Sequence, residues 1–253
     1  MKVITLPYSS DNFAYQCLTE EGGKASLLID TGVPLVAESL VQTTEYPLAA
    51  VLLTHSHHDH IGGLDAVLAK YPQAEIYAHP SLTAQLGRGT AVSDGQSIKI
   101  AGVGFEIYEC PMHCRDHVLF KAGKELFSGD VVFSGGCGRF FSGTADEFLT
   151  FAERLLAMDD DTRIHFGHEY TLGNLRFAMS VEPGNKNTAD YKKKVESGQL
   201  SPTTPTTLAH EKKINPFLRY SQEALRPFAE SKGVDFSNKA AVIAALRQAK
   251  DNF

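Results

Sequence analysis

An apolar run that stops at a cluster of histidines is the feature that most constrains this fold. Residues Ala49–Leu53 are all small or branched apolar residues, which is typical of a buried strand. The segment His55–His60, with the sequence His-Ser-His-His-Asp-His, follows almost at once and is itself followed by Gly62-Gly63. The end of a rigid strand is a place where side chains can converge at little ordering cost. The pattern therefore predicts a sheet with a ligand-bearing loop at the end of a buried strand.

Four side chains of this loop are candidate metal ligands: His55, His57, Asp59 and His60. Imidazole and carboxylate groups suit zinc, iron or manganese. In an extended turn, His55 and His57 can point to one side while Asp59 and His60 reach another. One loop could then serve two ions. The alternative is a chance polar loop, and the density of ligand types argues against it.

Three further candidate ligands each follow a predicted strand. They are His113 after Gly104–Glu109, Asp130 after Glu125–Ser128, and His168 after Arg163–Phe166. Any one of them alone would be read as a capping or surface residue. Together with the histidine loop, they predict a site for two divalent metal ions.

Strand patterns dominate the chain up to residue 169, and helical patterns replace them after it. Besides the strands above, we expect strands at Val3–Leu6, Phe13–Leu18, Ala25–Ile29, Ile76–Ala78, Ser97–Ile100 and His117–Lys121, with helices at Pro34–Thr44, Gly62–Tyr71 and Thr144–Ala157. The later helices are expected at Leu172–Val181, Ala189–Ser197, Thr207–Lys213, Gln222–Lys232 and Lys239–Lys250. The chain is thus predicted to be an α/β protein, with a metal-binding domain at 1–169 and a helical domain at 170–253.

The two predicted domains differ in charge. Residues 1–169 hold 11 Lys and Arg against 22 Asp and Glu, whereas residues 170–253 hold 13 against 8, so balances of −11 and +5 give the net charge of −6. A basic tail suggests an anionic partner, and a solvated lysine-rich helix surface is an equal alternative. The net negative charge and the lack of a basic, aromatic stripe argue against nucleic acid as a partner.

Cysteine usage and hydropathy bear on the compartment. No apolar run approaches the ~18 residues that cross a bilayer, and Met1–Pro7 lacks the apolar stretch of a signal peptide. The four cysteines are too scattered for a disulfide framework, and Cys110 and Cys114 have no second pair to complete a zinc site. We therefore expect a cytoplasmic monomer with no membrane partner.

Further motifs extend over the whole chain: Phe127–Phe133, Gly135–Phe141, Gly143–Glu147, Gly167–Thr171, Val181–Asn185, Pro205–Leu208 and Asn215–Arg219. The ligand pattern resembles that of the metallo-β-lactamase superfamily. With these motifs the chain resembles glyoxalase II, the hydroxyacylglutathione hydrolase family, within that superfamily. The Cys-Gly-Arg-Phe stretch and the C-terminal motifs make the resemblance specific.

The resemblance implies an αββα sandwich that carries the metals and a helical domain that helps to bind glutathione. One ion would be held by His55, His57 and His113, the other by Asp59, His60 and His168, and Asp130 would bridge the two. Asp59 and Asp130 are the expected catalytic residues, because they hold the ions beside the attacking hydroxide. Zinc is the expected metal, and iron and manganese are alternatives.

The resemblance also implies hydrolysis of S-D-lactoylglutathione, or a similar 2-hydroxyacyl thioester, to D-lactate and glutathione in the second step of methylglyoxal detoxification. Glutathione would be held by Arg139, Tyr170 and Arg219, with Phe141 beside its cysteinyl part. Arginine side chains suit its two carboxylates. A hydroxide shared by two metals needs no separate general base, and a thiol with a pKa of about 8.5 leaves without a strong acid.

Some residues near the predicted ligands depart from the family pattern or could be mistaken for ligands. Met112 and the segment Cys114–Asp116 depart from the family pattern around His113, and Phe141 stands where relatives often carry tyrosine. We expect Asp116 to face solvent, and the alternative is that its charge lies beside the metal site and strengthens metal binding. Asp30 is expected to be a buried supporting or turn residue rather than a ligand.

Other functions within the superfamily remain as alternatives. They are a lactonase, another thioesterase, or a sulfur dioxygenase with a single iron. A protein that keeps its metals for structure or sensing is the alternative outside catalysis. The seven-ligand set and the C-terminal motifs favour the glutathione thioesterase.

Overall fold

The structure, a computed structural model, describes residues 1–40 and 46–253. They form two compact units: unit 1 holds residues 1–109 and 116–129, and unit 2 holds residues 110–115 and 130–253. The domain boundary that we predicted after residue 169 falls within unit 2. The two sequence domains, 1–169 and 170–253, therefore stay a prediction.

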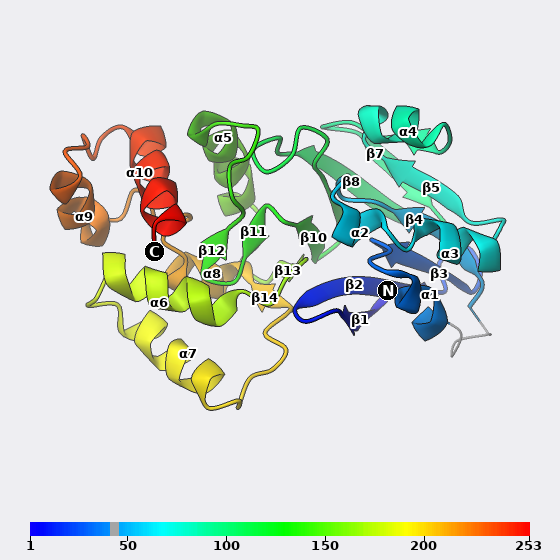
Figure 1. The fold of residues 1–253 in the computed structure, drawn as a ribbon, viewed down its shortest axis with the longest axis horizontal. Coiled ribbons are helices and arrows are strands. Elements are labelled where there is room, and N and C mark those ends of the chain that lie inside the picture. The colour runs from blue at the N-terminus through cyan, green and yellow to red at the C-terminus, as the bar shows by residue number, and fades with distance from the viewer. Residues whose placement is uncertain (41–45) are drawn as a thin grey trace. The chain divides into compact units, whose positions relative to one another are not determined.

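A six-stranded sheet, in the order β1 to β6, lies in unit 1 (Figure 1). Its strands are β1 (Lys2–Tyr8), β2 (Asn12–Thr19), β3 (Ala25–Ile29), β4 (Leu48–Leu52), β5 (Glu75–Ala78) and β6 (Thr90–Ala91). The first three strands pair antiparallel, and β3 to β6 pair in parallel. Strand β4 is almost wholly buried, which explains the continuous apolar run that predicted it.

Helices cover one face of this sheet (Figure 1). Unit 1 has α1 (Pro34–Ser39), α2 (His58–Ile61), α3 (Leu64–Lys70) and α4 (Pro80–Leu86). Side chains such as Val36, Val67 and Leu82 from the helices and Val51 and Ile76 from the strands share one buried core. The helix predicted at Pro34–Thr44 is confirmed as far as Ser39, and its residues 41–44 lie outside the described residues.

A second group of strands in unit 1 forms an antiparallel meander: β7 (Ser97–Ile100), β8 (Val103–Glu109), β9 (Val118–Ala122) and β10 (Glu125–Gly129). Burial alternates along most of β8, as expected for a strand with one packed face. The ring centroids of Tyr15 on β2 and Phe127 on β10 lie 5.7 Å apart. Both strand groups therefore contribute to the core of unit 1.

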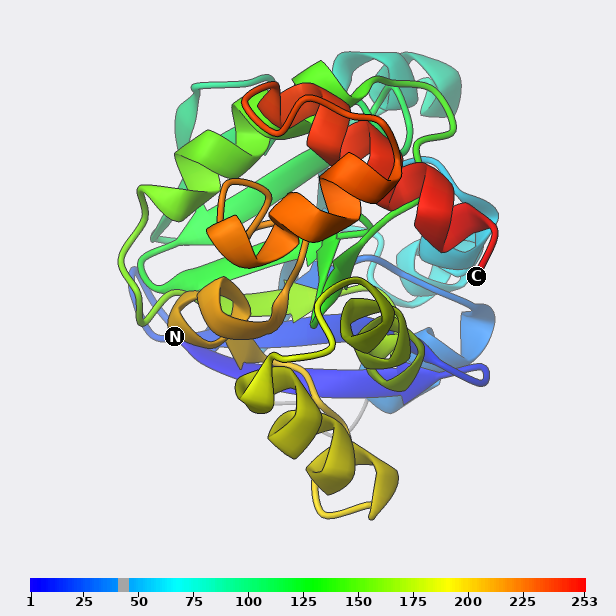
Figure 2. The same ribbon diagram turned by 90° about the vertical axis from the view of Figure 1, so that its left-hand side faces the viewer.

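Unit 2 contains two short strand pairs, β11 (Val132–Phe133) with β12 (Gly136–Cys137), and β13 (Arg163–Phe166) with β14 (Thr206–Thr207). Its helices are α5 (Ala145–Leu156), α6 (Thr171–Val181), α7 (Lys186–Glu196), α8 (Leu208–Ile214), α9 (Arg226–Ser231) and α10 (Lys239–Asp251). In Figure 2, α10 (red) lies beside α5 (green), and α6 lies beside α7. No described helix is long and apolar enough to cross a membrane.

The helices of unit 2 confirm the sequence analysis with small shifts at their ends. The predicted helix Gln222–Lys232 is divided into a 3-10 turn at Glu223–Leu225 and α9, because Pro227 has no N–H and suits the first turn of a new helix. Strand β14 was not predicted, and Thr207, expected to be helical, ends this strand and caps α8.

Candidate metal centre and substrate pocket

Asp30 anchors the histidine segment of unit 1 through its contacts with Thr54 and His60. Its backbone N–H donates to the Leu52 carbonyl oxygen at 2.9 Å. Its carboxylate accepts hydrogen bonds from the N–H and the hydroxyl of Thr54, both at 2.8 Å, and lies 2.8 Å from Nδ1 of His60. A carboxylate on one ring nitrogen orients the other nitrogen as the ligand atom. Asp30 is therefore the buried supporting residue that the sequence led us to expect.

Asp59 is held beside His60 by two side chains from β1 and β2. The hydroxyl of Tyr8 donates to the Asp59 carbonyl oxygen at 2.6 Å, and Nδ2 of Asn12 donates to Asp59 Oδ2 at 3.0 Å. Asp59 Oδ2 lies 3.8 Å from Nε2 of His60. These two potential ligand atoms are close enough to bind one ion.

His55 and His57 form a second pair in the same loop. Nε2 of His55 and Nδ1 of His57 lie 3.0 Å apart. Nδ1 of His55 lies 3.0 Å from the Thr54 hydroxyl, and its ring stacks on His117 with centroids 4.6 Å apart. Unit 1 thus offers two pairs of ligand atoms, divided in the way that the family resemblance implies.

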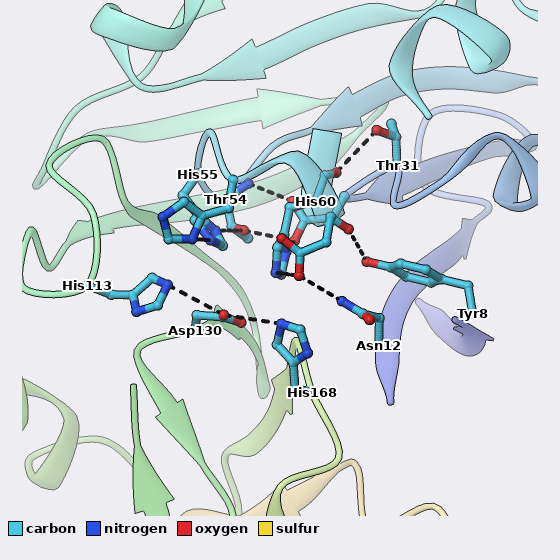
Figure 3. A network of polar contacts seen from close by, with 12 residues as sticks. Tyr8, Asn12, Thr31, Thr54, His55, His60, His113, Asp130 and His168 are labelled. Carbon is cyan, nitrogen blue, oxygen red and sulfur yellow. Dashed lines mark hydrogen bonds and ion pairs between the residues drawn. The ribbon is translucent and has the colours of Figure 1, made fainter. Parts of the chain in front are cut away.

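Asp130 lies between two histidines in unit 2 (Figure 3). Its Oδ2 atom is 3.5 Å from Nε2 of His113 and 3.3 Å from Nε2 of His168, and all three residues are buried. Nδ1 of His113 is 3.0 Å from the carbonyl oxygen of Arg139, and the ring of His168 stacks on Tyr170 with centroids 4.8 Å apart. A carboxylate between two oriented imidazoles has the placement that a bridging ligand requires.

A pocket of about 550 Å³ lies in unit 2 beside these ligands. Its lining includes three of the four residues predicted to bind substrate: Arg139, Phe141 and Tyr170. Phe141 and Tyr170 are 62% and 42% exposed, so both rings are accessible. The lining also includes His113 and Asp130, which places potential metal ligands and predicted substrate residues around the same space.

Arg219, the fourth predicted substrate residue, is not among the residues that line this pocket. Its guanidinium pairs with both carboxylate oxygens of Glu182, at 2.6 and 3.0 Å, and donates to the Lys212 carbonyl oxygen at 3.1 Å. Its side chain is only 16% exposed. The pocket therefore lends no support to its predicted contact with glutathione, which stays a prediction.

Two cations of α10 line the pocket and were not found from the sequence: Arg247 and Lys250. Arg247 donates to the Cys137 carbonyl oxygen at 3.0 Å, and Lys250 donates to the Gly173 carbonyl oxygen at 3.0 Å. Burial lowers the pKa of Lys250, and the nearby Arg247 lowers it further. Their spacing of three residues puts them on one helix face, and this spacing could have indicated a shared cationic site. Such spacing is common on helix surfaces, so it is not specific.

The segment that departs from the family pattern is largely buried. Met112 is fully buried, and its carbonyl oxygen accepts hydrogen bonds from the backbone N–H groups of Ser142 and Gly143. Asp116 was expected to face solvent, and this was wrong, since only 6% of it is exposed. It directly precedes His117 and strand β9, both buried, so the chain is already inside unit 1 at this point.

Two family models together match almost the whole chain. Residues 18–168 match the metallo-beta-lactamase superfamily, and residues 169–253 match the hydroxyacylglutathione hydrolase C-terminus. A hydroxyacylglutathione hydrolase of Chromohalobacter salexigens is 38% identical over 100% of both chains.

Solved structures support the fold. ETHE1 from Myxococcus xanthus has a TM-score of 0.65 at 21% identity and covers 99% of this chain and 98% of its own. TTHA1623, solved in a di-iron-bound form, has a TM-score of 0.58 at 26% identity and covers 86% of this chain and 100% of its own. These matches confirm the predicted metallo-β-lactamase fold with a helical C-terminal domain. The chain therefore belongs to the hydroxyacylglutathione hydrolase family of the metallo-β-lactamase superfamily.

Proposed function

We propose that this protein hydrolyses S-D-lactoylglutathione and similar 2-hydroxyacyl glutathione thioesters to the 2-hydroxy acid and glutathione, as the second step of methylglyoxal detoxification. Full-length similarity to hydroxyacylglutathione hydrolases supports this activity. The observation that carries it is the pocket of unit 2, where Asp130, between its two histidines, shares one space with Arg139 and Lys250.

The donor atoms suit two divalent metal ions. Unit 1 offers the pair His55 and His57 and the pair Asp59 and His60, and unit 2 adds two histidines on either side of Asp130. One ion would be held by His55, His57 and His113, the other by Asp59, His60 and His168, with Asp130 shared. We take zinc as the metal, and the same ligands accept iron or manganese. When bound, the ions would lower the pKa of a water to about 7 and polarise the thioester carbonyl.

The side chains around the site favour attack by water over covalent catalysis. The Asn12 amide donates to the Asp59 carboxylate and so holds it in place as a ligand rather than as a free nucleophile. Cys137 lines the pocket, but burial raises the pKa of its thiol to about 12, so the thiol stays protonated and is a poor nucleophile. The departing glutathione thiol has a pKa of roughly 8.5 and can leave as a thiolate without a general acid.

The cations of the pocket suit the glutathione portion. Glutathione carries two carboxylates and one ammonium group, and Arg139, Arg247 and Lys250 provide positive charge around the pocket. Tyr170 and Phe141 add exposed rings beside the metal ligands. We also propose, from the family resemblance alone, that Arg219 binds glutathione directly.

A panel of thioesters tests the proposal. Protein of measured metal content should hydrolyse S-D-lactoylglutathione with a kcat/KM at least about a hundredfold above that for the same acyl group on a small thiol, because only the former uses the cations of the pocket. Equal rates with and without the glutathione portion, or faster hydrolysis of lactones, would refute it. We also propose a cytoplasmic monomer that acts on this small molecule without nucleic acid or membrane partners, and light scattering should give the mass of a single chain.

A further inference from the structure

Glu211 is a buried carboxylate that the proposed chemistry does not use. It lies on α8 and has no exposed surface. Four donors surround its two oxygens: the Ser134 hydroxyl, the Gly135 N–H and the Thr206 hydroxyl, each at 2.8 Å, and Nδ2 of Asn215 at 3.1 Å. A fully satisfied buried network of this kind holds its members rigidly. Two of the donors belong to the turn between β11 and β12.

Two amide side chains hold the same turn from other directions. Nδ2 of Asn215 donates to the carbonyl oxygens of Gly136 at 2.9 Å and Phe133 at 3.2 Å. Nδ2 of Asn174 donates to the Ser134 carbonyl oxygen at 3.1 Å. A Cβ atom on Gly136 would lie 2.6 Å from the Asn174 side chain, so the turn has no room to shift toward α6.

The opposite end of this hairpin carries one proposed metal ligand, Asp130. Asp130 lies just before β11, and a Cβ atom on Gly138, just after β12, would lie 1.9 Å from the Asp130 carbonyl oxygen. Gly138 also donates its N–H to the Val131 carbonyl oxygen at 3.2 Å. The next residue, Arg139, offers its carbonyl oxygen to Nδ1 of His113 at 3.0 Å. The position of the hairpin therefore determines the position of Asp130 and the orientation of the His113 ring.

We infer that Glu211 is a positioning residue for the metal centre, acting through the hairpin turn on Asp130 and on the carbonyl that orients His113. All of these contacts lie within unit 2. The inference rests on the proposed function only in taking Asp130 and His113 as metal ligands. Losing a group that directly orients a ligand costs about 10- to 100-fold in metal affinity, and Glu211 acts from further away, so we expect about tenfold.

The test compares Glu211→Ala with Glu211→Gln and with a control for stability. A glutamine keeps one oxygen for Gly135 and Asn215, and the hydroxyls of Ser134 and Thr206 can rotate to accept from its amide. Glu211→Gln should therefore restore wild-type behaviour to within about twofold. The control is Leu155→Ala, a fully buried apolar site on α5 outside the hairpin and α8.

Two readouts separate positioning from general stability: amide hydrogen exchange of residues 130–139 in metal-free protein, and zinc affinity by competition with a chelator. In Glu211→Ala, the Gly138 amide should exchange about tenfold faster and zinc should bind about tenfold more weakly. Each variant is compared at the same number of degrees below its own melting temperature. In Leu155→Ala, the exchange rate of the Gly138 amide and the zinc affinity should both stay within about twofold of wild type. Equal changes in the two variants, or unchanged exchange and affinity in Glu211→Ala, would overturn the inference.

If Glu211→Ala does not accumulate as folded protein, Ser134→Ala gives the same test on a smaller scale. It removes one of the four donors, so each readout should change about threefold. No change in either readout would overturn the inference. A wild-type protein that binds no zinc would instead refute the proposed function, and the exchange of metal-free protein would still decide the role of Glu211.

Discussion

The two units build their ligand sets in opposite ways. In unit 1, all four proposed ligands come from one six-residue segment that was predicted as a loop and whose second half is helix α2, and a single carboxylate, Asp30, orders it through Thr54 and His60. In unit 2, the three proposed ligands come from three separated places in the chain, and a backbone carbonyl and a hairpin order two of them. A local motif contains its own geometry, whereas a dispersed set depends on distant contacts. Damage to the set of unit 2 should therefore have the wider effect.

Asp130→Ala should have the largest effect, because Asp130 lies between both histidines of unit 2. We expect loss of most of both metals and a fall in kcat/KM of at least about a thousandfold, since the ions supply several kcal/mol of transition-state stabilisation. Metal analysis together with thioester kinetics measures both. Two retained ions per chain in this variant would contradict the bridging role.

His57→Ala should have a narrower effect, because His57, whose Nδ1 lies 3.0 Å from Nε2 of His55, is a proposed ligand of one ion and does not bridge the two. We expect about one ion per chain to remain and activity to fall about a hundredfold, since loss of one ligand weakens one ion chiefly. His58→Ala is the matched control, because His58 is an exposed neighbour in the same loop. Retained turnover in His57→Ala, or equal loss in both variants, would refute the assignment.

Arg139 and Arg219 allow a comparison within unit 2. Arg139 is 55% exposed and lines the pocket, so Arg139→Ala should raise KM for glutathione thioesters about tenfold and spare a small thioester. Arg219→Ala leaves Glu182 buried without its cation and should cost about 3 kcal/mol of unfolding free energy. Kinetics and urea unfolding of both variants check this. A tenfold KM change in Arg219→Ala at unchanged stability would instead support its predicted role in glutathione binding.

The smallest expected effect is the pH dependence of the free energy of unfolding, which we attribute to His165 in unit 2. Burial of His165 on β13, with a smaller contribution from the charge of Arg163, lowers its pKa from 6.5 to about 3. The unfolded chain takes up this proton below pH 6.5 and the folded chain does not until about pH 3, so stability falls as the pH drops through this range. The loss between pH 6.5 and 5 should be about 2 kcal/mol.

Urea unfolding of metal-free protein measures this effect. His165→Gln should remove most of the difference between pH 6.5 and pH 5, because glutamine does not titrate. An equal loss of stability in the wild type and in this variant would show that another group is responsible.

The same contrast explains what the sequence could predict. The buried strand β4, the histidine loop and most helices depend on local patterns, so they could be found without coordinates. Helix α4 carried a usable signal as well, since Pro80 begins it and the His79 side chain accepts from the Ser81 N–H as a cap.

Contacts between residues far apart in sequence could not be predicted. The hydrogen bond from Arg247 to Cys137 joins residues 110 positions apart, and neither residue type signals it. The burial of Glu211 could not be found either, because a glutamate followed by two lysines on a helix is typical of a solvated surface. Asp116 was misplaced for the same reason, since an isolated acidic residue in a loop is most often exposed.

The central proposal is that the protein hydrolyses the glutathione thioester with two bound metal ions. It is tested most directly by adding zinc to metal-free protein while measuring hydrolysis of S-D-lactoylglutathione. We expect activity to rise until two equivalents are bound and then to stay constant, because the proposed mechanism needs both ions. A plateau at one equivalent, or full activity in protein that binds no metal, would contradict the account.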